Sequence, residues 1–129
     1  MNQTEVHILL VEDNALNQMI ITKLVQKIPY KLTLADDGDE ALKYVQDERQ
    51  PIDLVLMDLH LPNMDGYQTV RKIRALPQGR DLPIVALTAG KEQDLPHHVE
   101  EAGMIALLSK PINIEALKEI VNDHVMPRK

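Results

Sequence analysis

Short apolar runs alternate along the chain with longer stretches of mixed composition. The runs contain no internal Gly or Pro, which is typical of strands buried on both faces, and in the mixed stretches apolar residues recur at helical spacing. Four runs are therefore expected to be strands, at residues 6–11, 54–58, 83–88 and 105–108, and residues 31–35, which alternate between polar and apolar, are expected to be a further short strand. The apolar positions of the expected helices fall at residues 16–28, 41–45, 70–76 and 114–125, with a further short helix at about residues 95–102.

Single residues mark some of the helix ends. Asp13 or Asn14 is a suitable N-cap for the first helix, and Gly103 is a suitable terminator for the short helix. Pro96 is tolerated only in the first turn of a helix, so we expect the short helix to begin late or to be irregular.

Strands that alternate with helices predict a parallel sheet covered by helices on both faces. Five such units with short connections and no internal linker predict one α/β domain over residues 1–129. The expected architecture is a flavodoxin-like, doubly wound five-stranded parallel sheet of order 2-1-3-4-5. The binding crevice of such a sheet lies at the carboxyl ends of strands one and three.

Composition excludes several classes of function. The chain has 14 basic and 20 acidic residues, a net charge of −6 and no basic block, so it is a poor candidate for binding nucleic acid by itself. It has no cysteine, which excludes disulfides and thiolate metal sites and fits a cytoplasmic location. No apolar stretch approaches the roughly 18 residues of a membrane span, and the first residues lack the features of a signal peptide.

Asp58 ends the third apolar run, and a turn follows it. By itself, such an aspartate is most often a cap for its own turn. In the expected topology, however, Glu12 and Asp13 end the neighbouring first strand, so that three carboxylates converge on one crevice. Like charges this close repel unless a cation bridges them, and oxygen-only ligands suit a hard ion such as Mg²⁺.

Two more polar residues lie at the carboxyl ends of strands. Thr88 ends the fourth strand with a hydroxyl, and Lys110 follows the fifth strand with an ammonium group. Together with Asp58 these groups suit phosphoryl transfer, because an aspartate can form an acyl phosphate while a metal ion, a lysine and a hydroxyl contact the phosphoryl oxygens.

Four stretches, taken in order, resemble the receiver domain of two-component response regulators over about residues 6–125. They are Leu-Val-Glu-Asp-Asn at 10–14, Leu-Met-Asp-Leu-His-Leu-Pro-Asn-Met-Asp-Gly at 56–66, Ala-Leu-Thr-Ala at 86–89 and Leu-Ser-Lys-Pro at 108–111. The resemblance implies the same flavodoxin-like fold, and it implies that Asp58 is the phosphoacceptor. It also implies a Mg²⁺ site, with Asp13 and Asp58 as direct ligands, the backbone carbonyl of His60 as another, and Glu12 as a ligand through water. Thr88 and Lys110 are implied to contact the phosphoryl group. The Lys110–Pro111 bond is expected to be cis, as it is in most of the family, against roughly 5–6% of X–Pro bonds in general.

Within the family, residues 11–18 and 57–66 resemble the receivers of hybrid histidine kinases. The resemblance implies a histidine kinase or a histidine phosphotransfer protein as the partner, commonly docked on the first helix. Asn17, Ile20 and Ile21 of that helix are expected near the acidic pocket. Because only one face of a helix is buried, one isoleucine is expected to point inward and the other to be partly exposed. Both a stand-alone protein and a part of a hybrid kinase remain open.

The sequence departs from the family three residues before Lys110, where an aromatic residue is usual and Leu107 stands instead. The phosphorylation chemistry is expected to survive this change, whereas the aromatic part of the output switch is missing. Residues 105–107 are apolar, which fits either ordinary strand packing or a contact patch formed by the fourth helix, the fifth strand and the last helix, through which the chain could form a weak homodimer. Exposed fractions below about a tenth for all three side chains would support packing alone.

Two other functions fit the residues less well. A haloacid-dehalogenase-type phosphatase also uses a nucleophilic aspartate, but it needs a second aspartate two residues later, where this chain has His60. A flavodoxin-like nucleotide binder needs a phosphate-cradling loop after the first strand, and residues 12–14 are acidic there. The chain is therefore expected to catalyse only its own phosphorylation and dephosphorylation, and not to be a turnover enzyme.

Overall fold

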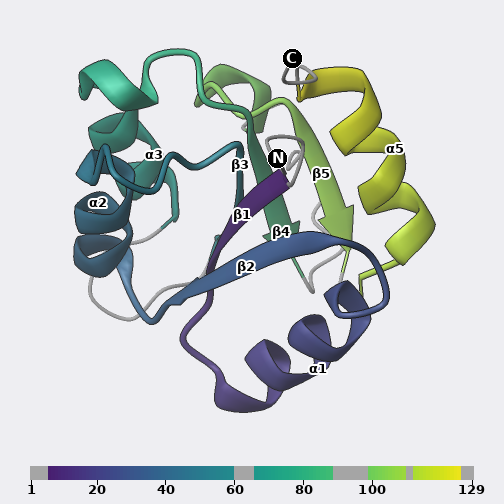
Figure 1. Ribbon diagram of the computed structural model, residues 1–129. Coiled ribbons are helices and arrows are strands. Elements are labelled where there is room, and N and C mark those ends of the chain that lie inside the picture. Colours follow the sequence, from purple (N-terminus) through teal and green to yellow (C-terminus); the bar gives the residue numbers. More distant parts are fainter. Residues whose placement is uncertain (1–5, 60–65, 89–98, 110–111, 126–129) are drawn as a thin grey trace.

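The computed structural model describes residues 6–59, 66–88, 99–109 and 112–125. Their centre is a five-stranded sheet in which every pairing is parallel and the strand order is β2-β1-β3-β4-β5 (Figure 1). The strands are β1 (Val6–Val11), β2 (Tyr30–Ala35), β3 (Leu54–Asp58), β4 (Ile84–Thr88) and β5 (Ala106–Ser109). The predicted strands, their order and the flavodoxin-like fold class are therefore confirmed, with boundaries displaced by one residue in β2, β4 and β5.

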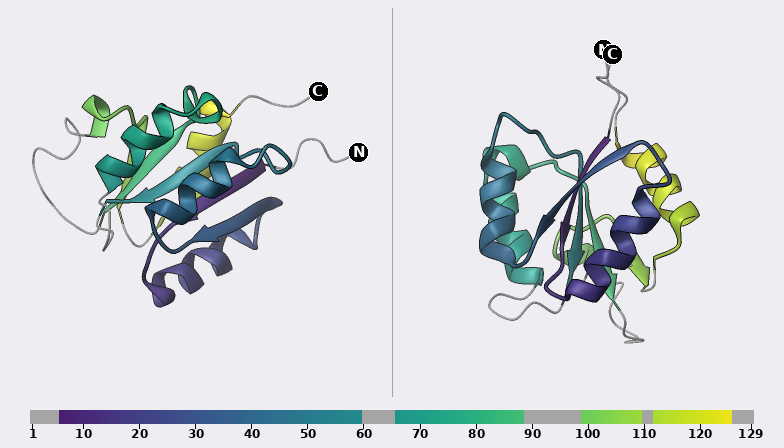
Figure 2. Two further views of the ribbon diagram at one scale, coloured as in Figure 1. Left: turned by 90° about the vertical axis from the view of Figure 1, so that its left-hand side faces the viewer. Right: turned by 60° about the horizontal axis from the view of Figure 1, so that its bottom comes forward.

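Helices cover both faces of the sheet. They are α1 (Ala15–Val25), α2 (Gly38–Gln46), α3 (Gly66–Arg74), the 3₁₀ helix η1 (Pro77–Gly79) and α5 (Ile114–His124). The helices α1 and α5 lie on one face, and α2 and α3 lie on the other (Figure 2). Within the described ranges, none of the helices has both the length and the apolar character needed to cross a membrane.

Each face of the sheet has its own core because successive side chains of a strand point to opposite sides. In β1, Leu9 and Val11 pack with α2 and α3, whereas Ile8 and Leu10 pack with α1 and α5. Every residue of β3 and β4 is buried. Double-sided burial explains why these strands consist of continuous apolar runs and not of alternating apolar and polar residues.

Of the apolar positions that predicted α1, only Leu24 and Ile28 pack against the core, and both are only partly buried. The buried residues are Ile21, which is 3% exposed, and Val25, whereas Leu16, Met19 and Ile20 are 62%, 53% and 40% exposed. This helix carries apolar residues on more than one side, so its spacing indicates a helix without indicating which side meets the sheet. The expectation that one of the two isoleucines points inward is confirmed, with Ile21 as the inward residue.

Residues 99–101 are helical and end in a turn that Gly103 makes possible. Gly103 has a φ of +95°, its N–H donates to the Glu100 carbonyl, and the N–H of Met104 donates to the Val99 carbonyl. This is the pattern of a Schellman C-cap, so the predicted terminator is confirmed. The rest of the predicted short helix, including Pro96, lies outside the described residues.

The side chain of Arg74, at the end of α3, forms a hydrogen bond with this turn. Its guanidinium donates to the carbonyls of Gly79, Leu82 and Gly103 at 2.6, 2.7 and 2.6 Å. Burial lowers the pKa of the Arg74 guanidinium, and Asp81 partly offsets that effect. Because arginine remains charged in proteins, these are charge-assisted hydrogen bonds, and they join the end of α3 to the connection before β4 and to the turn at Gly103.

Candidate functional site

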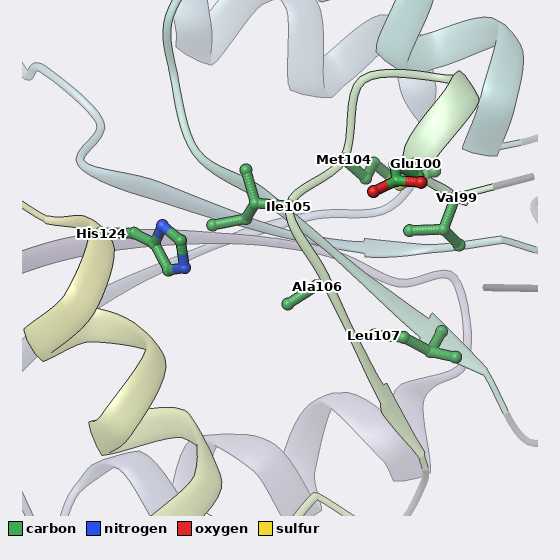
Figure 3. A pocket seen from close by; sticks show the side chains of 7 residues that line it. All are labelled: Val99, Glu100, Met104, Ile105, Ala106, Leu107 and His124. Atoms are coloured by element: carbon green, nitrogen blue, oxygen red, sulfur yellow. The ribbon is translucent and has the colours of Figure 1, made fainter. Parts of the chain in front are cut away.

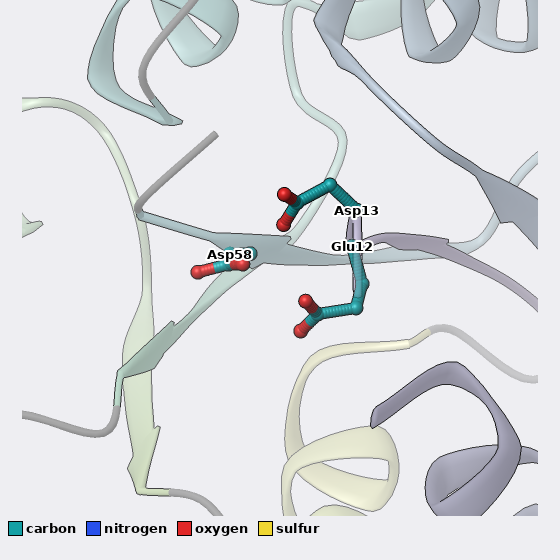
Figure 4. A group of neighbouring side chains, drawn as sticks. All are labelled: Glu12, Asp13 and Asp58. Carbon is teal, nitrogen blue, oxygen red and sulfur yellow. The ribbon is translucent and has the colours of Figure 1, made fainter. Parts of the chain in front are cut away.

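Three carboxylates meet at the carboxyl ends of β1 and β3. The two strands are neighbours in register, with Val11 paired to Met57, so Glu12 and Asp13 follow β1 where Asp58 ends β3. Ligand atoms of the three carboxylates lie within 4.8 Å of one another. Figure 4 shows the side chains projecting into the same space beyond the strand ends. The predicted convergence of Glu12, Asp13 and Asp58 is therefore what the fold produces.

Burial of two of these carboxylates raises the free-energy cost of keeping them ionised. Glu12 is 1% exposed and Asp58 is 3% exposed, whereas Asp13 is open to solvent. The two buried carboxylates are costly without compensating charge or hydrogen bonds, and all three carboxylates repel one another. The donor set consists only of oxygen atoms and has one open side, which fits a hard divalent cation that keeps some of its water. The residues present thus fit Mg²⁺.

Local hydrogen bonds hold the end of β1 in place. Asn14 is the N-cap of α1, since its side chain accepts a hydrogen bond from the Asn17 N–H, and its own N–H donates to Glu12 Oε2 at 3.1 Å. The side-chain amide of Gln18 donates to the Glu12 carbonyl and to Asp36 Oδ1 at 2.6 and 2.7 Å. The sequence alone does not identify Gln18 or Asp36 as parts of the site. The only signal was the position of Gln18 in the first turns of the helix that follows the acidic pair.

Thr88 ends the strand adjacent to β3. It is buried, and because Asp58 pairs with Leu87, Thr88 is the next residue beyond that pair at the same edge of the sheet. Thr88 in turn pairs with Ser109, the residue before Lys110. The predicted contributions of Lys110, of the His60 carbonyl and of a cis Lys110–Pro111 bond lie outside the described residues and remain predictions.

Gly66 lies directly against the backbone of Asp58. Its N–H donates to the Leu59 carbonyl at 3.3 Å, and a Cβ at this position would lie 2.6 Å from the Asp58 carbonyl oxygen. A side chain here would displace the end of β3, so the start of α3 can approach the site only with glycine. The turn glycine of the sequence motif therefore has a direct packing role beside Asp58.

A second feature lies away from the carboxylates, at β5. A pocket of about 670 Å³ is lined by seven residues (Figure 3): Val99, Glu100, Met104, Ile105, Ala106, Leu107 and His124. Ile105 is 38% exposed, and Ala106 and Leu107 are half-buried. Strand packing alone does not account for this stretch, so the interpretation of residues 105–107 as an apolar contact patch is the one that the exposure favours.

Comparison with known proteins places the whole of this architecture in one family. The sequence pattern of the response regulator receiver domain matches residues 8–122. Sensor histidine kinase RcsC of Salmonella typhi is 37% identical over 112 residues, which are 87% of this chain and 11% of that kinase. The chain therefore spans about a tenth of the length of that relative.

Solved structures agree in both fold and sequence. The receiver domain of sensor histidine kinase PA1611 from Pseudomonas aeruginosa PAO1, with a magnesium ion coordinated in its active site cleft, is 41% identical with a TM-score of 0.82, covering 93% of this chain and 97% of that one. The receiver domain of the response regulator Ssk1 of Saccharomyces cerevisiae, solved with the histidine phosphotransfer protein Ypd1, is similar at 28% identity and a TM-score of 0.81, covering 95% and 90% of the two chains.

Proposed function

The chain belongs to the family of response regulator receiver domains, and from this premise we propose that Asp58 accepts a phosphoryl group from a phosphohistidine in two-component phosphorelay signalling, with Mg²⁺ as the cofactor. The observation that carries the proposal is the convergence of Glu12, Asp13 and Asp58 at the edge of the sheet. We take residues 1–129 to be a single receiver domain.

The proposed mechanism assigns one role to each side chain. An Asp58 carboxylate oxygen forms a bond to phosphorus while the bond between phosphorus and the donor imidazole nitrogen breaks, leaving an acyl phosphate and a neutral histidine. Asp13 and Asp58 would hold Mg²⁺ directly, together with the His60 carbonyl, and Glu12 would hold it through water. When bound, the ion neutralises negative charge on the phosphoryl oxygens. The Thr88 hydroxyl donates a hydrogen bond to one of these oxygens, and the Lys110 ammonium pairs with another.

This mechanism is tested with a small acyl-phosphate donor. Incubation with the donor and Mg²⁺ should add one phosphate to the intact mass of the protein, and Asp58→Asn should abolish the addition. The adduct should accumulate to at most one phosphate per chain, as expected of a protein that catalyses only its own phosphorylation and dephosphorylation. Rapid turnover of a phosphomonoester without an accumulating adduct would instead indicate the phosphatase, and absence of both would contradict the acceptor role.

The exposed apolar residues of α1 are the proposed docking surface for the partner. Leu16, Met19 and Ile20 are spaced i, i+3, i+4, so they share one side of a helix whose N-cap, Asn14, contacts Glu12. A histidine-bearing partner seated there is close to the carboxylates. The proposed partner is a histidine kinase or a histidine phosphotransfer protein, as in the complex of Ssk1 with Ypd1.

Docking and chemistry are separated by using two donors. Ile20→Ala should slow phosphotransfer from a phosphohistidine protein and leave phosphorylation by a small acyl phosphate unchanged, because only the first reaction uses the surface of α1. Tyr44→Ala, at another partly exposed apolar residue on α2, is the control and should change neither rate. Equal losses with both donors would show that Ile20 acts on the site and not on docking.

Two finer expectations also belong to the proposal. The exposed Ile105 and the pocket around it favour weak self-association through residues 99–101, β5 and α5. Sedimentation at increasing concentration should show this association weakened by Ile105→Asp.

The cytoplasmic location remains a prediction from the cysteine-free sequence.

A further inference from the structure

Gln18 joins three segments that meet at the acidic site. It lies in α1, and its side-chain amide bonds the Glu12 carbonyl at the end of β1 and the Asp36 carboxylate after β2. Its backbone is held in the helix, with its N–H donating to the Asn14 carbonyl and its carbonyl accepting from the Thr22 hydroxyl at 2.7 Å. The amide therefore projects from a fixed base.

Gln18 completes a set of contacts that hold Glu12 from three directions. The Glu12 N–H donates to the Ala35 carbonyl at 3.0 Å, which continues the pairing of β1 with β2 by one residue. The Glu12 carbonyl accepts from Gln18, and Oε2 accepts from the Asn14 N–H. The Gln18 bond thus fixes the peptide that joins Glu12 to Asp13, and the direction of that peptide sets where both side chains leave the chain.

Both hydrogen bonds of the Gln18 amide are short, and the one to Asp36 is charge-assisted. Donation to the Asp36 carboxylate is a hydrogen bond to an ionised acceptor, which is stronger than a neutral pair. Removal of the amide takes one of these restraints from the Glu12–Asp13 peptide, and mutual repulsion of the carboxylates then favours a rotation that separates them. A cation would have to draw them back together, so its affinity falls.

We propose that Gln18 is a positioning residue for the Mg²⁺ site, acting through the Glu12–Asp13 peptide and linking α1 to that site. The inference rests on the proposed function, since it concerns the same three carboxylates. Groups that orient metal ligands typically change metal affinity by about 10- to 100-fold when removed. Because Gln18 bonds the backbone of the ligands and not their carboxylates, we expect an effect of about tenfold, at the lower end of that range.

The test compares Gln18→Met with Gln26→Met. Both substitutions replace glutamine by an unbranched residue of similar helix propensity, and Gln26 is exposed at the opposite end of α1. Calorimetric titration of metal-free protein with Mg²⁺ should give a dissociation constant about ten times higher for Gln18→Met than for the parent chain, with no change for Gln26→Met. Circular dichroism establishes that each variant is folded, and a purely structural role leaves the Mg²⁺ affinity of folded protein unchanged.

A second variant and a second measurement make the result decisive. Gln18→Asn keeps the amide but is one methylene too short to span both acceptors, so it should weaken Mg²⁺ binding in the same direction and replaces Gln18→Met if that variant does not fold. Excess Mg²⁺ should restore phosphorylation of the variants by an acyl phosphate. Unchanged Mg²⁺ affinity, or a rate that remains low at saturating Mg²⁺, would overturn the inference. A parent chain that binds no Mg²⁺ would instead refute the proposed function.

Discussion

Two adjacent isoleucines of α1, Ile20 and Ile21, should respond very differently to truncation. Ile→Ala removes three carbon groups, which at about 0.8 kcal/mol per buried group is a transfer loss of roughly 2.4 kcal/mol. Ile21 is 3% exposed between α1 and the sheet, so a cavity term of about 1 kcal/mol adds to this loss. The higher helix propensity of alanine returns roughly 0.4 kcal/mol, so we expect Ile21→Ala to lower the free energy of unfolding by about 3 kcal/mol. Ile20 is 40% exposed, so the loss is about 1.4 kcal/mol, and the higher helix propensity of alanine returns roughly 0.4 kcal/mol.

The expected difference between the two variants is therefore about 2 kcal/mol, which urea unfolding resolves easily. Leu16→Ala provides an independent check on the exposed side, since it should change stability by less than Ile21→Ala. The ranking should reverse in phosphotransfer from a phosphohistidine protein, where Ile20→Ala is the more damaging change. Equal destabilisation by Ile20→Ala and Ile21→Ala would mean that the assigned orientation of α1 is wrong.

Three further predictions concern charge and hydrogen bonding. Asp13→Asn should raise the free energy of unfolding of Mg²⁺-free protein by on the order of 1 kcal/mol, because one of three mutually repelling carboxylates is neutralised. The same variant should show none of the rise in melting temperature that millimolar Mg²⁺ gives the parent chain. Arg74→Lys should lower the free energy of unfolding in urea by about 3 kcal/mol, since a lysine cannot reach the three carbonyls that Arg74 bonds. The exposed Arg71→Lys should change the free energy of unfolding by no more than about 0.5 kcal/mol, and similar values for the two variants would contradict the role of Arg74. Burial raises the pKa of the Tyr30 phenol above its ordinary value of 10.0, so the folded state favours the neutral phenol. The contribution of this phenol to stability should be fully present below pH 10.0 and be lost as the pH rises through the folded-state pKa, and Tyr30→Phe should flatten that loss in urea unfolding at a series of pH values.

The strands β1, β3 and β4 were predictable because burial on both faces leaves a continuous apolar run, whereas the half-buried β2 was predictable from the alternation of its residues. Their order was predictable because few topologies accept five alternating units. Asp58, Glu12 and Asp13 were predictable for a related reason, since parallel neighbouring strands end at the same edge. These inferences need only the position of each residue within its own strand.

The orientation of α1 and the role of Gln18 required the folded chain. In α1 apolar residues lie on more than one side, so apolar spacing alone does not show that Ile21 and Val25 meet the sheet. Gln18 acts through Glu12 and through Asp36, which is 18 residues away in sequence, so no local pattern reveals the contact. A glutamine on a helix is otherwise read as a solvated residue.

The central claim, that the phosphoryl group is carried by the Asp58 carboxylate, is tested most directly by finding which residue is modified. The protein is incubated with an acyl-phosphate donor and Mg²⁺, reduced with borohydride, which converts an aspartyl phosphate to homoserine, and digested for tandem mass spectrometry. The account predicts homoserine at position 58 alone, and none when Mg²⁺ is chelated. Homoserine at Asp13 in place of Asp58, or phosphate retained on a histidine, would contradict it.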